Sequence, residues 1–153
     1  MLPSSSLYEE TNQRYYIEAQ TKLEPACRVL PSSAAEVAKI VSIATEKQCH
    51  FAVASGKHWV ISGGSNIGPD GFTIDLMFLN GTSLSKDHSI ASIGPGLRAG
   101  AVYDFLDQYG LYVAVGRGEH RAHNVAFEIL MLIQIETLEC KHVPSAGCFC
   151  FSI

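Results

Sequence analysis

The hydrophobic pattern predicts a strand, a helix and a second strand near the start of the chain. Cys27–Leu30 is short and apolar and is followed by proline, which is typical of a strand. The next segment has one apolar face at helical spacing, formed by Val37, Ile40, Val41 and Ala44. Ser33, with Glu36 three residues later, predicts a capping box at the start of this helix. Phe51–Ala54 is the second strand, and a crossover of this kind normally joins parallel strands.

Further elements are predicted on both sides of this unit. Tyr8–Gln20 is rich in helix formers and free of glycine and proline, so we expect one helix there. Strands are expected over Phe72–Leu76, Ser89–Ile93 and Leu111–Val115, and Asn80-Gly81 is a turn signal. A second long helix is expected to begin near Arg98 and to end at Gly110, with an inner face of Val102, Phe105, Leu106 and Tyr109.

The segment from Asn124 to Glu136 has a strand period. Its residues alternate between two faces, which predicts a strand that is mostly buried. Without a covering layer, the apolar residues 125–135 would invite self-association of the chain. We find no packed element in the sequence after Leu138.

Composition supports a globular domain and disfavours some partners. The chain has 153 residues, of which 47% are hydrophobic and 17% are charged. The net charge is -4 and the basic residues are scattered, so we do not expect nucleic acid as a partner. Residues 1–6 lack the features of a secretory signal, and Val125–Ile135 is shorter than the roughly 20 residues that span a bilayer. We therefore expect a cytoplasmic location and no membrane span.

The cysteines predict neither disulfides nor a metal site. The five cysteines are odd in number and irregular in spacing, which argues against a disulfide framework. A zinc site is the alternative for the tail, with Cys140, His142, Cys148 and Cys150 as ligands. Structural zinc sites usually space paired cysteines by two to four residues, so a tail without metal is favoured.

Candidate chemistry lies in two glycine-bearing loops that follow strands. Phe51–His58 runs from a strand into a loop with one histidine, and Ser62–Asn66 continues it with more glycine. Ile93–Gly96 is a second turn of this kind. Glycine permits positive φ and close backbone approach, which brings N–H groups against a phosphate. The loops therefore predict a nucleotide cofactor.

The ordered series of these motifs resembles the FAD-binding domain of the vanillyl-alcohol-oxidase and para-cresol-methylhydroxylase (PCMH) superfamily. Within it, the fungal berberine-bridge-enzyme-like FAD-linked oxidoreductases are the most similar. The similarity runs from about Tyr8 to Arg117. It is carried by Leu23–Cys27, Pro31–Val37, Phe51–His58, Asn66-Ile67, Phe72–Leu76, Ile93–Gly100, Tyr103, Leu111 and Gly116-Arg117.

The resemblance implies FAD as cofactor and a set of contact residues. The family's loop reads Arg-Ser-Gly-Gly-His; its amides hold the pyrophosphate, and its histidine is the usual attachment point for the flavin. The matching positions are Ser55, Gly56, Lys57 and His58. The family's second contacting turn matches Gly94 and Gly96, for which an ordinary strand-to-helix turn is the alternative. For His58 the alternative is a surface histidine bonded to backbone.

Two positions depart from the family's loop. Lys57 replaces a glycine and Ala54 replaces the usual arginine. A non-glycine residue at positive φ costs about 1–2 kcal/mol. The lysine amine could attract the phosphates and partly replace the charge lost at Ala54. We expect FAD contact at this loop to be weakened rather than abolished. Asp75 is expected to serve the end of its strand, and Arg98 a solvated helix start.

The resemblance also implies a fold and a domain organisation. The expected fold is α+β, with a small parallel βαβ subdomain followed by part of a mixed sheet with flanking helices. Residues 1–22 form a helical segment, 23–117 a partial PCMH-type FAD-binding domain, and 118–153 a divergent strand and tail, with no substrate domain. After Arg117 the family's second glycine-rich segment is missing, and Asn124–Leu130 looks like a later strand of the family. A truncated product is our hypothesis.

Two functions remain open at this point. The first is an FAD-dependent oxidoreductase that transfers hydride from a small organic substrate to FAD, with reoxidation by O₂, in fungal secondary metabolism. The second is a non-catalytic remnant or interaction module that keeps part of the FAD site. No catalytic residue is assigned, because the family's base lies in the substrate domain. His120, Arg121 and His123 are expected to be exposed loop residues.

Overall fold

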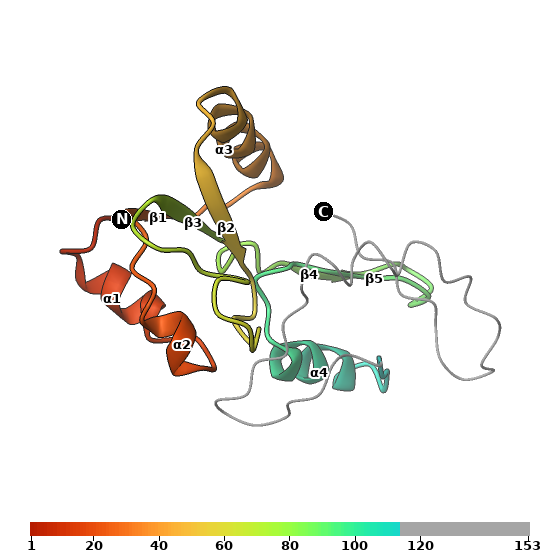
Figure 1. Ribbon diagram of the computed structural model, residues 1–153. Coiled ribbons are helices and arrows are strands. Elements are labelled where there is room, and N and C mark those ends of the chain that lie inside the picture. Colours follow the sequence, from red (N-terminus) through yellow and green to blue (C-terminus); the bar gives the residue numbers. More distant parts are fainter. Residues whose placement is uncertain (114–153) are drawn as a thin grey trace.

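The structure is a computed structural model that describes residues 1–113 (Figure 1). The helices are α1 (Ser6–Asn12), α2 (Glu18–Thr21), α3 (Ala34–Glu46) and α4 (Ala99–Asp107). The strands are β1 (Cys27–Val29), β2 (His50–Ala54), β3 (Gly71–Asp75), β4 (Thr82–Leu84) and β5 (Ala91–Ile93). The predicted α+β fold is confirmed, with a parallel sheet first and an antiparallel pair after it.

The parallel sheet has β3 at its centre. The strand order is β1-β3-β2, and both neighbours run parallel to β3. The predicted crossover through α3 therefore joins parallel strands, but a third strand lies between them. Ile74 is fully buried in β3, and Thr73 beside it is too. A strand that is covered on both faces suits the centre of a parallel sheet, which explains the order.

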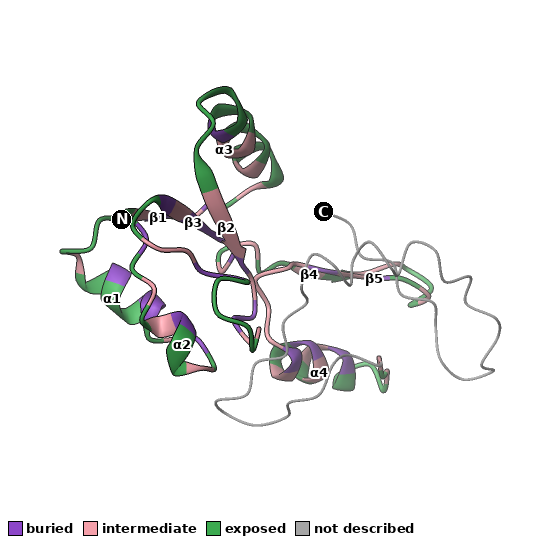
Figure 2. Ribbon diagram, viewed as in Figure 1, coloured by how far each residue is buried: buried purple, intermediate pink, exposed green. Residues whose placement is uncertain are grey.

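Helix α3 begins where the sequence predicts. The Ser33 hydroxyl accepts a hydrogen bond from the N–H of Glu36 at 3.2 Å. The Glu36 carboxylate reaches back to Ser32, one residue before the expected partner, at 2.7 Å from its N–H. On the predicted inner face only Ala44 is fully covered, while Val37, Ile40 and Val41 are half-buried. Figure 2 shows how much of this helix is exposed.

The prediction of one helix over Tyr8–Gln20 is wrong in the middle of that range. The chain forms two short helices, α1 and α2, and leaves helical geometry between them. Ile17 has extended backbone angles, with φ -112° and ψ 139°. Tyr15 donates its hydroxyl to the carbonyl of Ser65 at 2.7 Å, and Tyr16 donates its N–H to Lys57 at 2.9 Å. These contacts with a distant loop override the local helix propensity.

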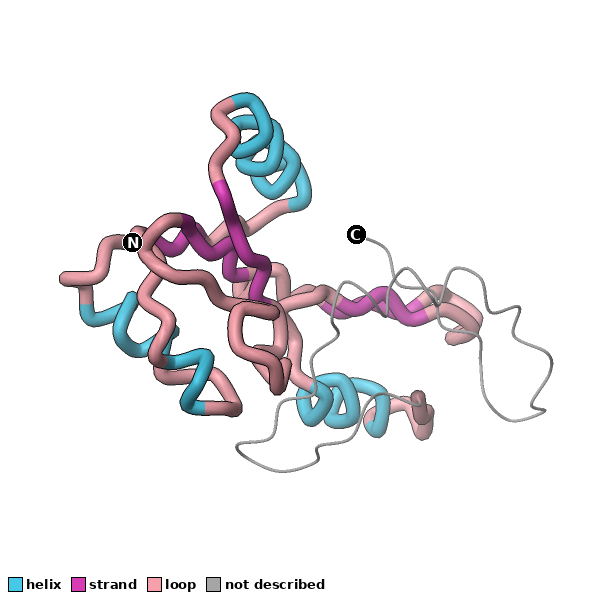
Figure 3. Tube along the Cα trace, in the orientation of Figure 1, coloured by secondary structure: helices cyan, strands magenta, loops and turns pink. Residues whose placement is uncertain are grey.

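The second sheet, the antiparallel pair of β4 and β5 (Figure 3), shares a hydrophobic core with α4. Its core comprises Ala91, Ile93, Val102 and Leu106, all buried. Strand β4 was not predicted, because Thr-Ser-Leu is too short to show a period. Tyr109 remains 46% exposed, so its predicted place on the inner face is wrong. Gly110 has φ +65° and ends α4 as predicted.

Several predictions fall on residues outside the described range. These are the strand over 124–136, the residues 114–115 of the strand over 111–115, the tail cysteines, the two histidines at 120 and 123, and the junction after Arg117; they stay predictions. Residues 111–113 carry no strand. In the described part of the chain, no helix is long and apolar enough to cross a membrane. The same part holds no cluster of three or more side chains suited to a metal ion.

Candidate functional site

The loop after β2 has the backbone geometry expected for a phosphate site. Lys57 has φ +61°, so the position that the resemblance assigns to glycine is left-handed here as well. Among the hydrogen bonds within residues 1–113, none is donated by the backbone N–H groups of Ser55, Gly56, Lys57 or His58. These four donors follow directly from the carboxyl end of a parallel strand. Such N–H groups can bind the oxygens of a phosphate.

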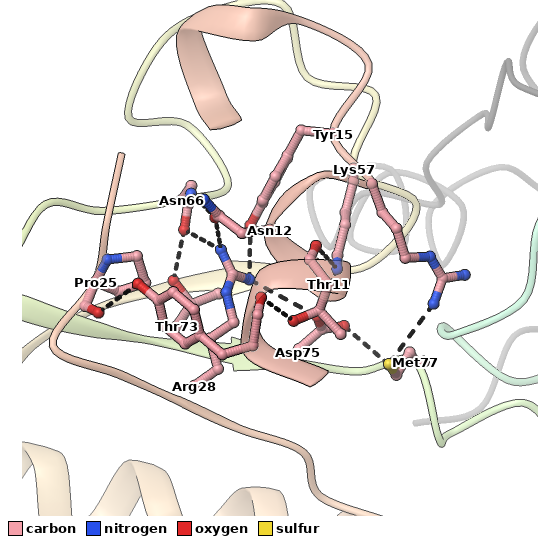
Figure 4. A network of polar contacts seen from close by, with 12 residues as sticks. Thr11, Asn12, Tyr15, Pro25, Arg28, Lys57, Asn66, Thr73, Asp75 and Met77 are labelled. Carbon is pink, nitrogen blue, oxygen red and sulfur yellow. Dashed lines mark hydrogen bonds and ion pairs between the residues drawn. The ribbon is translucent and has the colours of Figure 1, made fainter. Parts of the chain in front are cut away.

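The expectation that the Lys57 amine attracts the phosphates of FAD is wrong. The amine does not face the place of the phosphates but lies inside the protein, with only 4% of the residue exposed. The nitrogen is 2.6 Å from Oδ2 of Asp75, and it donates a hydrogen bond to the carbonyl of Thr11 at 2.8 Å (Figure 4). The contact with Asp75 is an ion pair between two buried side chains. Asp75 is therefore a buried counter-ion and not only the end of a strand.

Arg28 is the second cation of this buried cluster. One guanidinium nitrogen donates to the side-chain oxygens of Asn12 at 2.5 Å and Asn66 at 2.8 Å. The other lies 3.8 Å from Oδ2 of Asp75. Arg28 and Asp75 are both fully buried, so within the described residues two cations share one carboxylate (Figure 4). The ring of Tyr15, 5.3 Å from the guanidinium, adds a cation–π contact.

Burial shifts the protonation of two groups in the cluster. It lowers the pKa of Lys57 to about 8, although the negative charge of Asp75 partly opposes this shift. Burial also raises the pKa of Tyr15 to about 12, so its hydroxyl stays protonated. That proton is the one donated to the carbonyl of Ser65. The cluster thus links the N-terminal segment, the sheet and both ends of the 55–66 loop.

His58 is half-buried and lies against an aromatic ring. Its imidazole stacks on Tyr16, with the ring centroids 4.0 Å apart and the planes inclined by 17°. Within residues 1–113 the imidazole makes no hydrogen bond or ion pair, unlike the surface histidine of the alternative interpretation.

Gly94 and Gly96 have a structural reason to be glycine. Their N–H groups donate to the carbonyls of Gly81 and Leu79, each at 2.8 Å. A β-carbon at Gly94 would collide with the Leu79 carbonyl, and one at Gly96 with that of Leu76. The close approach that these glycines permit is therefore made by the chain's own backbone. Their contact with a cofactor stays a prediction.

The two loops are joined directly. The Ser55 hydroxyl donates a hydrogen bond to the carbonyl of Pro95, which lies between the two glycines. This bond ties the loop after β2 to the turn after β5. Arg98 follows as the N-cap of α4 and is half-buried, so the predicted solvated position is only partly right.

Sequence reasoning missed most of the buried polar cluster. Arg28 occupies the middle of a three-residue strand, and it pairs in register with Thr73. A charged residue between two apolar ones in a short buried strand was the available signal. Asn12 and Asn66 gave no comparable signal, because asparagine is equally common in caps and turns.

Comparisons with known proteins agree with this geometry. Residues 25–123 match the family described as "FAD binding domain", which is more than half of the chain. The chain belongs to this family of FAD-binding domains. FAD is therefore its cofactor, and the loop after β2 fits the group, because within the described residues it offers unbonded N–H groups.

Relatives of this FAD-binding domain are much longer proteins. An FAD-dependent monooxygenase of Arthrobotrys oligospora is 44% identical over 95 residues, which cover 62% of this chain and 19% of that protein. One of Emericella nidulans is 38% identical over 118 residues, covering 75% of this chain and 24% of that protein. The chain thus spans about a fifth of the length of the curated relatives it matches.

Solved flavoenzymes share the fold. The crystal structure of 6-hydroxy-D-nicotine oxidase from Arthrobacter nicotinovorans has a TM-score of 0.64 at 25% identity, covering 76% of this chain and 25% of that one. A BBE-like protein of Arabidopsis thaliana has a TM-score of 0.63 at 20% identity, covering 77% and 25%. The predicted PCMH-type fold of the FAD-binding domain is confirmed.

The ion pair of Lys57 predicts a specific loss and rescue. Lys57→Gly should lower the free energy of unfolding by about 1–4 kcal/mol, because Asp75 loses its nearest cation in a buried site (about 3–5 kcal/mol) while glycine relieves the left-handed backbone (about 1–2 kcal/mol). Ala54 is fully buried and lies beside Asp75 in register, so Ala54→Arg in the same chain should recover part of this loss. Denaturant unfolding of the parent, the single variant and the double variant measures both effects. A double variant no more stable than Lys57→Gly would contradict this assignment.

Stability should depend on pH through the same lysine. The folded pKa of about 8 lies below the unfolded value of about 10.4, so between these pH values the folded chain binds fewer protons. The contribution of Lys57 should therefore rise with pH, by at most about 1.4 kcal/mol per unit. The measurement is the unfolding free energy of the parent minus that of Lys57→Met at pH 7.5 and 9.5. A difference that stays constant or falls would refute the buried lysine.

Gly96 offers a test of backbone approach. Gly96→Ala should destabilise the fold by about 1–3 kcal/mol, because the new methyl group meets the backbone of Leu76 and Met77. Gly68→Ala is the matched control, since a β-carbon there meets nothing within 4 Å. Thermal unfolding of the two variants without added FAD separates packing from cofactor contact. Equal melting temperatures would show that the approach is looser than described.

Proposed function

We propose that this chain supplies the FAD-binding part of an FAD-dependent oxidoreductase that acts on a small organic substrate, in fungal secondary metabolism. The observation that carries the proposal is the loop after β2. It combines four unbonded N–H groups, a left-handed Lys57 and an imidazole that is free of hydrogen bonds in the described residues. The FAD-dependent monooxygenases among the relatives support the reaction class.

Each part of the loop has a role in this proposal. The N–H groups of Ser55 to His58 bind the pyrophosphate, and His58 contacts the flavin. FAD, when bound, supplies the hydride acceptor, which O₂ reoxidises. Gly94 and Gly96 contribute by holding the neighbouring turn against Leu79 and Gly81. We assign no catalytic base among the described residues.

FAD retention tests the proposal. The purified full chain, incubated with FAD and desalted, should keep flavin near one per chain, and His58→Ala should weaken retention about tenfold, because it loses the ring contact (about 1.4 kcal/mol). His50→Ala is the control, since His50 is exposed at the start of β2. Flavin absorbance per chain is the measurement, and absorbance that survives acid precipitation in the parent but not in His58→Ala reports covalent attachment through His58.

The outcomes distinguish the two candidate functions. Retained flavin that a substrate panel bleaches supports the oxidoreductase. Retained flavin that no substrate bleaches supports a non-catalytic FAD-binding module. A parent chain that retains no FAD would refute the proposal, and equal retention by the parent and His58→Ala would remove His58 from the site.

A further inference from the structure

Within residues 1–113, the His58 ring stacks on one aromatic neighbour. Among residues 1–113 its imidazole makes no hydrogen bond and no ion pair, and its ring contact is the stack on Tyr16. The centroid distance of 4.0 Å and the angle of 17° describe two nearly parallel rings in contact. A histidine usually owes its orientation to a hydrogen bond on one ring nitrogen. Here the aromatic face of Tyr16 takes that place.

Tyr16 is itself fixed by the segment that carries it. Its N–H donates to the carbonyl of Lys57, the residue next to His58, at 2.9 Å. On one side Tyr15 is bonded to the carbonyl of Ser65. On the other side the Gln20 amide donates to the carbonyl of Ile61 at 2.7 Å. Residues 15–20 therefore form a strap that is bonded to the loop at several points, these three among them.

The break between α1 and α2 serves this arrangement. Helix α1 ends at Asn12 and α2 begins at Glu18, so Tyr15 and Tyr16 both lie outside helical geometry. The Tyr15 side chain is buried, whereas Tyr16 is 45% exposed beside His58. One tyrosine thus anchors the strap in the core, and the other presents its ring at the surface of the loop.

We propose that Tyr16 is a positioning residue for the cofactor, which covers one face of the His58 imidazole and holds the ring for contact with the flavin. The inference rests on the proposed function, because it takes FAD as the ligand of the loop. With one face covered by Tyr16, a planar ligand meets His58 only at its free edge or its opposite face. The stack also limits rotation of the ring before the cofactor binds.

The test compares Tyr16 variants with a matched exposed tyrosine. Tyr16→Ala should weaken FAD retention by the full chain about threefold to tenfold, the range expected for one aromatic stack. Tyr16→Phe should retain FAD like the parent, because the ring remains. Tyr112→Ala is the control, since Tyr112 is 77% exposed. FAD titration followed by flavin fluorescence is the measurement.

A second readout separates positioning from folding. Without FAD, the ring protons of His58 in the parent should show the upfield NMR shift of a stacked imidazole. Tyr16→Ala should lose this shift while its urea midpoint changes no more than that of Tyr112→Ala, and Tyr16→Phe should keep it. Unshifted His58 signals in the parent would overturn the stack.

The two proposals fail in different ways. If the parent binds FAD and Tyr16→Ala binds it equally well, the positioning role is refuted and the proposed function stands. If the parent binds no FAD, the proposed function is refuted, and the role of Tyr16 toward the cofactor is refuted with it.

Discussion

The buried carboxylate of Asp75 joins the parallel sheet to the loop after β2 and, through its cations, to the N-terminal segment. In a medium of low dielectric constant a charge is stable only beside its partners, and Asp75 has Lys57 at 2.6 Å and Arg28 at 3.8 Å. The three residues come from β3, the loop after β2, and β1. Arg28 then reaches Asn12 of α1 and Asn66 ahead of β3. The position of the cofactor loop is thus fixed by charges that lie on its inner side.

Lys57 has two separate roles because its backbone and its side chain face different surroundings. Its left-handed backbone costs about 1–2 kcal/mol for a residue with a β-carbon. Its side chain supplies the nearest cation to a buried carboxylate whose other cation, Arg28, lies at 3.8 Å. The substitution of the family's glycine therefore does not add charge to the phosphate site. Lys57 supplies a cation to Asp75 from the loop. An arginine at position 54 could supply such a cation from strand β2.

The sequence could predict those features that depend on residues close together in the chain. The strands over Cys27–Val29, His50–Ala54 and Gly71–Asp75 and the Ser33 cap follow from short patterns and neighbouring residues. The order of the strands, the break between α1 and α2 and the destination of the Lys57 amine depend on residues far apart in the sequence: Lys57 and Asp75 are 18 positions apart, and Tyr15 and Ser65 are 50. The loop's residues could be named from their resemblance to a family. The buried polar network beneath the loop could not be predicted. Asparagine, threonine and tyrosine occur in many settings, and their hydrogen-bond partners here are brought together only by folding.

The N-terminal segment is bonded to the cofactor loop, although the family match begins only at residue 25. Hydrogen bonds from Tyr15, Tyr16 and Gln20 cross from this segment to the loop, and Thr11 accepts the one from Lys57. Losing these residues would leave the Lys57 amine with one partner fewer and His58 without its stacked ring. Residues 11–20 therefore act on the cofactor loop from both sides: through the buried amine beneath it and through the aromatic ring at its surface.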